Sequence, residues 1–376
     1  MSGPLEGLKV IELAGIGPSP YACMLLADLG ADILRLERAN PNASDEPYWD
    51  LLARSRPSVA VNLKHDEGRE LVLELAEQAD VLVEGFRPGV AERLGVGPSD
   101  VWSRNKKVVY GRMTGWGQDG PLAARAGHDI NYIALSGALW PIGREGERPV
   151  PPLNLVGDFG GGGMLLAFGI LAAVFAARSS GEGQVVDAAM IDGSASLMAM
   201  THAFLNAGLW KEERGTNLLD TGAHFYEVYA TKDEKFMAVG AIEKQFYAEL
   251  IKGLELSTDY LATQMDRSKW AEMKILFTDI FARKTRDEWT AIFEDVDACV
   301  TPVLAPSEAP LHPHMAAREV FASELRQPNP APRFSKTPGA IASAARTPGS
   351  GTRAGLASWG VSDDRVAALL ASGALG

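Results

Sequence analysis

The sequence predicts an α/β protein: a large domain built on an open, Rossmann-like parallel sheet, followed by a smaller α+β domain. Up to about residue 192, β-branched runs alternate with helical stretches, which is the pattern of βαβ units with right-handed crossovers. From Phe225 onward the pattern changes to a predicted β-hairpin followed by helices. A chain of 376 residues is long enough for two domains.

The elements of the large domain follow from these runs. Strands are expected at 8–13, 32–37, 58–63, 81–84, 107–113 and 185–191, and helices at 21–29, 66–78, 132–139 and 160–178. The first strand and helix are joined by a turn that has Gly15 and Gly17, but Pro20 stands where a dinucleotide fingerprint needs its third glycine. A tight turn is therefore preferred and a dehydrogenase is disfavoured, although Glu37 ends the second strand where a ribose-binding acid stands in such enzymes.

The second half of the chain divides into four expected segments. They are linker helices (193–224), a small α+β domain (225–306), a proline-rich return linker (307–330) and a C-terminal segment that rejoins the large domain (331–376). The hairpin is expected at 226–229 and 236–239, with helices at 243–254, 270–281 and 285–293. A final helix begins after Ser362 as N-cap and stops at Gly373.

Composition indicates a soluble protein of the reducing cytoplasm. The net charge of -12 argues against nucleic acid or an anionic membrane surface as a partner, so an anionic ligand would need a local cluster of arginines. Cys23 and Cys299 are interpreted as buried free thiols. The first residues lack the pattern of a signal peptide, and the most apolar run, Met164–Ala177, is interpreted as a buried helix too short to span a bilayer.

Two short motifs carry candidate chemistry. Gly127-His128-Asp129 places an imidazole beside a carboxylate, and Gly157-Asp158-Phe159 places a carboxylate at the start of an apolar helix. An imidazole and a carboxyl group of raised pKa are the two groups needed to move a proton in both directions near pH 7. The residues alone leave a second interpretation open, in which His128 is a turn or core histidine and Asp158 only caps its helix.

Several segments resemble the family III CoA-transferase group, and they occur in the order found in that family. They are Gly7–Leu13, Leu26–Asp32, Phe86–Gly89, Gly127–Asp129, Gly157–Gly162, Gly181–Asp187 and His312–Arg318. The resemblance runs from residue 7 to the C-terminal helix. It implies the fold of that family, an acyl-CoA thioester as substrate and an interlocked homodimer.

Within this group, the resemblance favours the racemases. Asp158 matches the aspartate that carries the acyl group in the transferases, but a racemase needs an acid and a base on opposite faces of one carbon, and His128 supplies the second group. The implied reaction is interconversion of (R)- and (S)-2-methylacyl-CoA thioesters by 1,1-proton transfer through an enolate. The alternatives are a CoA-transferase with an acyl intermediate on Asp158, and a non-catalytic acyl-CoA-binding protein in which His128 is idle.

The resemblance also assigns supporting roles. The backbone N–H of Asp129 is expected to stabilise the enolate oxygen, and Glu243 to pair with His128, although from the residues alone Glu243 is better interpreted as a first-turn helix acid. Asn154 and Tyr226 are expected to support the site.

Arginines are expected to hold the phosphates of CoA. The resemblance points to Arg38, Arg87 and Arg93, with Arg54 and Arg56 as further candidates. Ile16 and Met190 are candidates to line the acyl path, although core packing is the better explanation for each of them. Proton transfer calls for no cofactor besides the CoA of the substrate, and the other histidines lack the spacing of metal ligands, so no metal is expected.

Overall fold

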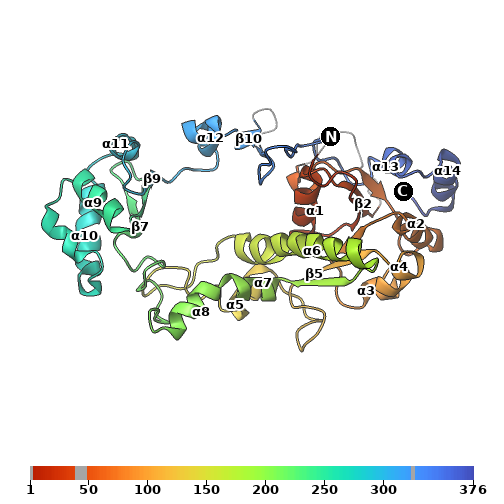
Figure 1. The fold of residues 1–376 in the computed structure, drawn as a ribbon, viewed down its shortest axis with the longest axis horizontal. Helices are drawn as coiled ribbons and strands as arrows, with labels where there is room; N and C mark the ends of the chain where they lie inside the picture. The colour runs from red at the N-terminus through yellow and green to blue at the C-terminus, as the bar shows by residue number, and fades with distance from the viewer. Residues whose placement is uncertain (1–2, 39–48, 323–326) are drawn as a thin grey trace. The chain divides into compact units, whose positions relative to one another are not determined.

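The computed structural model describes residues 3–38, 49–322 and 327–376, and the chain folds into two compact units (Figure 1). The first unit comprises Met1–Ser136, Leu153–Leu197 and Glu319–Gly376, and the second comprises Gly137–Pro152 and Met198–Arg318.

A six-stranded parallel sheet forms the centre of the first unit. Its strand order is β3-β2-β1-β4-β5-β6, which confirms the predicted Rossmann-like sheet. The strands are β1 (Lys9–Leu13), β2 (Asp32–Glu37), β3 (Ser58–Ala60), β4 (Val81–Glu84), β5 (Val109–Thr114) and β6 (Val185–Ala189). All six lie where the sequence predicts strands, because buried parallel strands need continuous β-branched runs.

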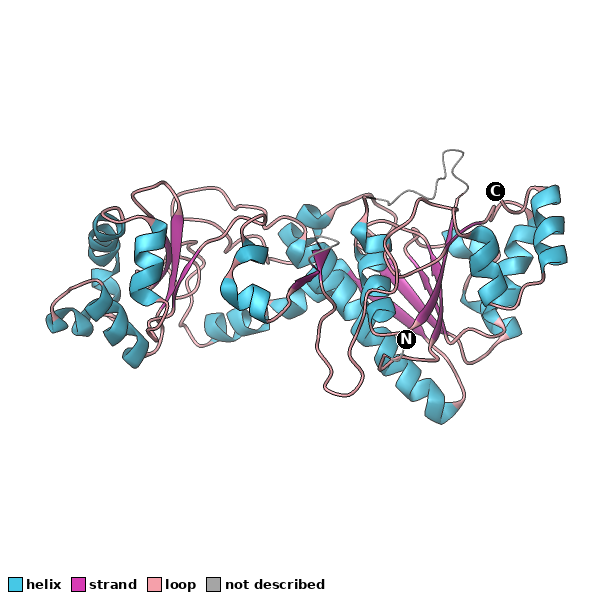
Figure 2. Ribbon diagram, turned by 90° about the horizontal axis from the view of Figure 1, so that it is seen from above, coloured by secondary structure: helices cyan, strands magenta, loops and turns pink. Residues whose placement is uncertain are grey.

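Helices cover both faces of this sheet (Figure 2). One face packs against α1 (Pro18–Asp28) and α6 (Leu165–Ser180) through a core that includes Leu26 and Ile170. Helices on the opposite face, in order along the chain, are α2 (Asp66–Ala76), α3 (Val90–Arg93), α4 (Pro98–Arg104), α13 (Thr352–Ser358) and α14 (Asp363–Ser372). The sequence predicts α14 with its Ser362 cap but not α13, which lies in a stretch of low complexity.

The apolar helix of the first unit is longer than expected. A π-helix, η2 (Leu155–Met164), runs directly into α6, and the resulting stretch Leu155–Ser180 is long and apolar enough by composition to cross a membrane. The prediction that this run is too short was therefore wrong. One side of this helix is buried in the first unit, since Leu166 and Ile170 pack fully buried against β5, where Gly111 leaves room for both side chains.

Two short helices near the sheet complete the site region. They are α5 (Asp129–Leu135) and α7 (Met190–Leu197). The helix expected at 132–139 begins three residues earlier, at Asp129, and ends before Gly137, whose positive φ of 84° stops it.

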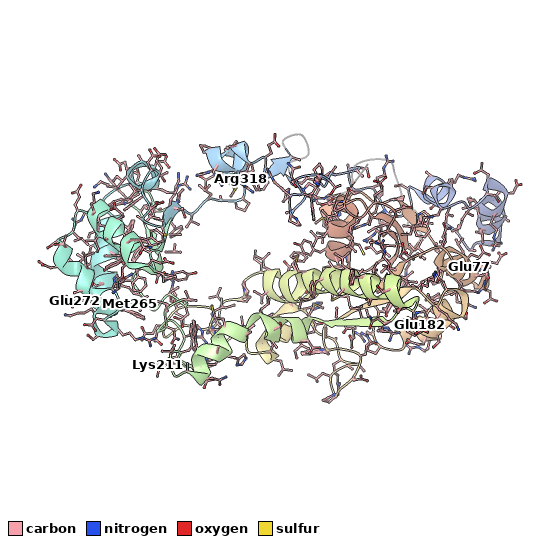
Figure 3. All side chains as sticks on the ribbon, in the orientation of Figure 1. Glu77, Glu182, Lys211, Met265, Glu272 and Arg318 are labelled. Carbon is pink, nitrogen blue, oxygen red and sulfur yellow. The ribbon has the colours of Figure 1, made fainter. Side chains whose placement is uncertain are left out.

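The second unit contains an antiparallel sheet of three strands in the order β7-β8-β9. The predicted hairpin is β7 (Tyr226–Ala230) and β8 (Phe236–Gly240), and the sequence did not predict β9 (Val300–Pro302). Aromatic side chains such as Phe277 and Trp289 fill its core. Its helices, in order along the chain, are α8 (Ala199–Asn206), α9 (Lys244–Gly253), α10 (Trp270–Phe281), α11 (Arg286–Phe293) and α12 (Pro313–Ala317). Acidic side chains such as Glu77 in the first unit and Glu272 in the second are exposed to solvent (Figure 3).

The bounds of the two units differ from those of the predicted domains, and the largest difference is an interruption of the first unit. The expected large domain, residues 1–192, is interrupted, because Gly137–Pro152 belongs to the second unit. Arg144 in this segment pairs with the buried Glu227 of β7 at 2.8 Å, and Arg214 donates a hydrogen bond to the carbonyl oxygen of Trp140 at 2.7 Å. These contacts connect residues more than 70 positions apart, which local sequence patterns do not encode.

Candidate active site

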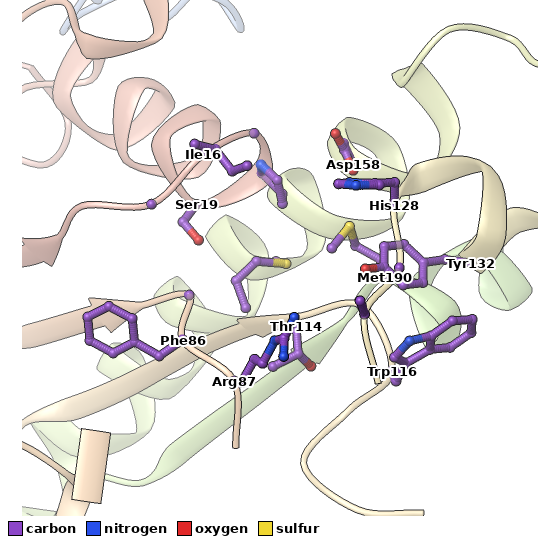
Figure 4. A pocket seen from close by; sticks show the side chains of 18 of the residues that line it. Ile16, Ser19, Phe86, Arg87, Thr114, Trp116, His128, Tyr132, Asp158 and Met190 are labelled. Atoms are coloured by element: carbon purple, nitrogen blue, oxygen red, sulfur yellow. The ribbon is translucent and has the colours of Figure 1, made fainter. Parts of the chain in front are cut away.

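A cavity of about 600 Å³ opens at the carboxyl ends of β1, β4 and β5. It is lined by the turn before α1, the loop after β4, the end of β5, and the residues around α5 and η2 (Figure 4). The carboxyl edge of an open parallel sheet is where α/β proteins bind ligands. His128 and Asp158 both line this cavity, so the structure brings the two predicted proton carriers together.

His128 and Asp129 stand at the start of α5. The backbone N–H of His128 donates a hydrogen bond to Oδ1 of Asn131 at 3.0 Å, which fixes the entrance to the helix and leaves the imidazole exposed to the cavity. The Asp129 side chain is buried and turned the other way. Its Oδ2 accepts a hydrogen bond from the backbone N–H of Asp158 at 2.7 Å, so the two motifs are directly connected.

Asp158 lies in the first turn of η2 with its carboxyl group half-buried. Burial raises the pKa of this carboxyl group above its ordinary value, and the charge of Asp129 acts in the same direction. The Asn154 amide, which donates a hydrogen bond to Oδ2 at 3.2 Å, and the nearby His128 both oppose this shift. The pKa of Asp158 is thus higher than that of an ordinary aspartate.

Glycines make this arrangement sterically possible. A Cβ on Gly157 would lie 2.5 Å from Oδ2 of Asp129, and one on Gly163 would lie 2.7 Å from the ring of Tyr21 on α1. The glycine run therefore lets η2 approach both α5 and α1. Only a residue without a side chain fits at these two positions.

Tyr132 is a site residue that the sequence interpretation missed. Its side chain is almost completely buried, lines the cavity and packs edge-to-face on Trp116 at 4.7 Å between ring centroids. Burial raises the pKa of its hydroxyl group, and the charge of Asp158 adds to this, whereas Arg87 opposes it. Its position three residues after Asp129, on the same face of a helix, is the signal that would have identified it.

The other predicted ligand-binding residues are distributed over several places. Ile16, which is 86% exposed, and Arg87, Asn154 and Met190 line the same cavity as His128. Arg93 is exposed on α3 outside the described lining of this cavity. Glu243, as the N-cap of α9, and Tyr226, on β7, belong to the second unit, and their predicted roles stay predictions.

A second cavity, of about 500 Å³, lies at the carboxyl ends of β1 and β2. Arg38 and Lys64 bring positive charge to it, and Leu375 forms part of its wall. Phe86 lines both cavities, which are therefore neighbours.

Arg54 and Arg56 are not free to bind a ligand. Arg54 is 3% exposed and forms an ion pair with Asp28 at 2.5 Å, and Nε of Arg56 lies 3.1 Å from Oε2 of the fully buried Glu12. Both guanidinium groups are neutralised inside the first unit, because a buried cation requires a partner there. Arg54 was expected to bind CoA, but it lies outside the described lining of both cavities and is paired with Asp28, so its role in CoA binding stays a prediction.

The fold and the cavity together define an α/β protein that brings an imidazole and a carboxyl group into one cavity at the carboxyl edge of its sheet. Within residues 3–38, 49–322 and 327–376, no group of three or more His, Cys, Asp and Glu side chains is placed to hold a metal ion.

The sequence model for CoA-transferase family III matches residues 5–353, and the chain belongs to this family. It is 48% identical to the α-methylacyl-CoA racemase of Mus musculus over 350 residues, which are 92% of this chain and 90% of that protein. It is 46% identical to the α-methylacyl-CoA racemase of Homo sapiens over 349 residues, with the same two coverages. A solved structure of a CAIB/BAIF family protein from Brucella suis shares the fold, with a TM-score of 0.82 and 23% identity over 96% of this chain and 100% of that chain.

Proposed function

We propose that this protein is an α-methylacyl-CoA racemase, which interconverts (R)- and (S)-2-methylacyl-CoA thioesters by 1,1-proton transfer. The observation that carries the proposal is that His128 and Asp158 line one cavity and that Asp129 connects their two loops by a hydrogen bond. The two mammalian racemases, at 46% and 48% identity, support the same assignment.

The reaction starts with the α-carbon of the thioester between His128 and Asp158. One group removes the α-proton, and the C–H electron pair moves into the enolate, leaving negative charge on the thioester oxygen. The other group then delivers its own proton to the opposite face of the carbon. Each turnover exchanges the protonation states of the pair, so both states must have similar energy. Because the pKa of the Asp158 carboxyl group is raised, it lies closer to the ordinary pKa of an imidazole than the pKa of an exposed aspartate does.

Stabilisation of the enolate oxygen comes from the start of α5. The backbone N–H of Asp129 is the first of that helix, and a donor of this kind is typically worth about 3 kcal/mol in the transition state. The Asp129 side chain has a separate task, because its bond to the Asp158 N–H holds the acid–base carboxyl group at a fixed distance from α5.

The CoA part of the substrate occupies the second cavity. Arg38 and Lys64 supply positive charge there, Phe86 forms the boundary toward the thioester, and Arg87 lies on the side of the reacting carbon. Local cations are needed because the chain as a whole carries a charge of -12, which repels an anionic ligand. The thioester carbonyl itself acidifies the α-proton, so the proposed reaction uses no further cofactor.

The proposal is tested by incubating one enantiomer of a 2-methylacyl-CoA with the enzyme in deuterium oxide. We expect deuterium at the α-carbon and formation of the opposite enantiomer. His128→Ala and Asp158→Ala should each lower both rates by about 10²–10⁴-fold, because each removes one proton carrier. Binding of CoA, measured by calorimetry, should remain.

His202→Ala is a suitable control, because His202 is exposed on α8 and lies outside the described lining of the cavity. It should retain wild-type exchange. Wild-type exchange in His128→Ala or in Asp158→Ala would contradict the assignment of that residue.

The second candidate function is a CoA-transferase of the same family. It is favoured by one observation: the Asp158 carboxyl group is open to the cavity and could attack a thioester carbonyl, forming a mixed anhydride and releasing the CoA thiolate. Such an enzyme exchanges labelled CoA between two carboxylic acids and accumulates an acyl group on Asp158 that hydroxylamine traps. Deuterium incorporation without CoA exchange identifies the racemase.

A further inference from the structure

Glu84 has a buried carboxyl group that the proposed proton transfer does not use. It ends β4 and is 3% exposed. Its Oε2 accepts a hydrogen bond from the backbone N–H of Phe86 at 2.6 Å, and its Oε1 lies 3.4 Å from Nε of Arg112 on β5. The Glu84 side chain is therefore hydrogen-bonded to the backbone of the loop that follows its own strand.

That loop, Gly85–Gly89, forms part of both cavities. Gly85, Phe86, Arg87 and Pro88 line the cavity that contains His128, where Figure 4 shows Phe86 and Arg87, and Phe86 also lines the cavity that contains Arg38. Pro88 has no N–H to donate, and the N–H of Phe86 connects the loop to the interior of the first unit. Its acceptor is Glu84.

The charges around Glu84 are unbalanced. Arg112 and Tyr110 face it from β5, Glu92 from α3 and Asp187 from β6. Arg112 is shared, because it also forms an ion pair with Glu92 and donates a hydrogen bond to Gln118 at 3.0 Å. Burial raises the pKa of Glu84 to about 7; the charges of Glu92 and Asp187 add to this shift, whereas the Phe86 N–H and Arg112 oppose it.

Because of this shift, the ionised form of Glu84 lowers the stability of the folded protein. The pKa of Glu84 is higher in the folded chain than in the unfolded chain, so the stability that the neutral form contributes is lost as the pH rises toward about 7. Above that pH the protein retains a buried charge that a neutral side chain would avoid. A residue that costs stability in this way is typical of functional sites.

We propose that Glu84 positions the loop Gly85–Gly89 for acyl-CoA and thereby makes the affinity for CoA depend on pH. The ionised carboxylate holds the Phe86 N–H by a charge-assisted hydrogen bond. When the group takes up a proton, that bond weakens and the new O–H faces Arg112, which has no acceptor to offer. Glu84 is a positioning residue, since it acts through Phe86 and Arg87. The choice of acyl-CoA as ligand rests on the proposed racemase function.

The test compares the wild type with Glu84→Gln between about pH 5.5 and 8.5. Calorimetry gives the Kd for free CoA, and kinetics give KM and kcat for racemisation. We expect wild-type Kd and KM to rise about 5-fold as the pH falls through the titration of Glu84, which is the effect of weakening one hydrogen bond. Glu84→Gln should lack this rise and have a similar kcat. Titration of the CoA phosphates is common to both proteins and cancels in the ratio of their Kd values.

Glu92→Gln provides a second, independent variant. It removes a charge that raises the pKa of Glu84 but leaves the bond between Glu84 and the Phe86 N–H in place. The Glu92 side chain is 47% exposed, and glutamine keeps an oxygen that can accept a hydrogen bond from Arg112. The pH at which Kd changes should move to a lower value while the size of the change stays the same. A purely structural role for Glu84 would not produce this movement.

Stability serves as the remaining readout. Because Glu84→Gln removes the buried charge, its Tm at about pH 8 should be at least that of the wild type. If Glu84→Gln does not fold, the proposal is tested by Glu92→Gln alone, through the pH at which its Kd for CoA changes. A ratio of wild-type to Glu84→Gln Kd values that does not change with pH, or a step that stays in place in Glu92→Gln, would overturn the proposal. Absence of α-proton exchange by the wild type would instead contradict the racemase function, because CoA binding is measured separately.

Discussion

Asp158 illustrates how single residues set the chemistry of this site. Its main chain is held by the Asp129 carboxylate and its side chain by the Asn154 amide, while burial raises its pKa. The amide opposes that shift, so Asn154 adjusts the proton affinity of the carboxyl group as well as its direction. Asn154 is therefore the residue at which pH dependence is most directly tested.

Asn154→Ala should move the acid limb of the kcat/KM profile to higher pH. Asn154 lowers the pKa of Asp158, so removing it raises that pKa, and the pair keeps its second proton up to a higher pH. The active pair carries one proton at the start of either direction, so the limb should move equally for the (R)- and the (S)-substrate. A profile that stays in place, or that moves to lower pH, would show that Asn154 does not act on Asp158.

Charged residues also show what the sequence can and cannot predict about the site. The positions of His128, Asp158 and Arg87 around one cavity were predicted, because each lies in a short motif at the end of a strand or the start of a helix. Arg54, a further candidate outside these motifs, lies inside the first unit, where it is paired with Asp28 and hydrogen-bonded to Gln327, 273 residues away. Which partner a charged side chain finds depends on such long-range contacts.

At the scale of elements, η2 decides the geometry of the site. This π-helix places Asp158 in its first turn, and its glycines allow close approach to α5 and α1. π-helical turns occur frequently at functional sites, because the wider turn redirects side chains. The sequence predicts a helix here but not its wider turn.

Gly157→Ala should disable the site while leaving most of the fold in place. The new Cβ would lie 2.5 Å from Oδ2 of Asp129 and push that carboxylate away from the Asp158 N–H. A displacement of about 1 Å is enough to lower kcat/KM by about 10²-fold. Kinetics and CoA calorimetry are the measurements, and Kd should change little.

Gly160→Ala is the matched control on the same helix. Its Cβ would meet the carbonyl oxygen of Leu155 at 3.1 Å and the side chain of Leu197 at 3.3 Å, away from Asp129. It should lose less activity than Gly157→Ala. Equal losses in both variants would mean that the helix as a whole, rather than the contact with Asp129, is responsible.

For the molecule as a whole, the most informative surface is an apolar face of α6 that the single chain leaves exposed. Phe168 and Phe175 of α6 are 69% and 78% exposed, and with Met164 they form an apolar face along one side of that helix. Large exposed apolar faces mark association surfaces. The resemblance to the family implies an interlocked homodimer, which we propose on the basis of this face.

Light scattering of the purified protein should give twice the chain mass of 40.2 kDa. Phe175→Asp places a charge on the apolar face and should shift the equilibrium toward monomer, with loss of racemase activity. A wild-type monomer that is fully active would contradict the dimer proposal. A wild type that remains monomeric but binds lipid vesicles would assign the same face to a membrane surface.

Local sequence patterns were enough to predict the elements of the fold and the residue types that carry the chemistry. Strands and helices follow from periodic burial of neighbouring residues, so the six-stranded sheet, the hairpin and the capped helix α14 were predicted close to their observed bounds. The tertiary structure decided which groups share an environment. It buried Arg54, transferred Gly137–Pro152 to the second unit, brought Tyr132 to the cavity and connected Glu84 to the loop of Phe86. These outcomes depend on desolvation and on contacts between distant segments, which the order of residues along a strand or helix does not reveal.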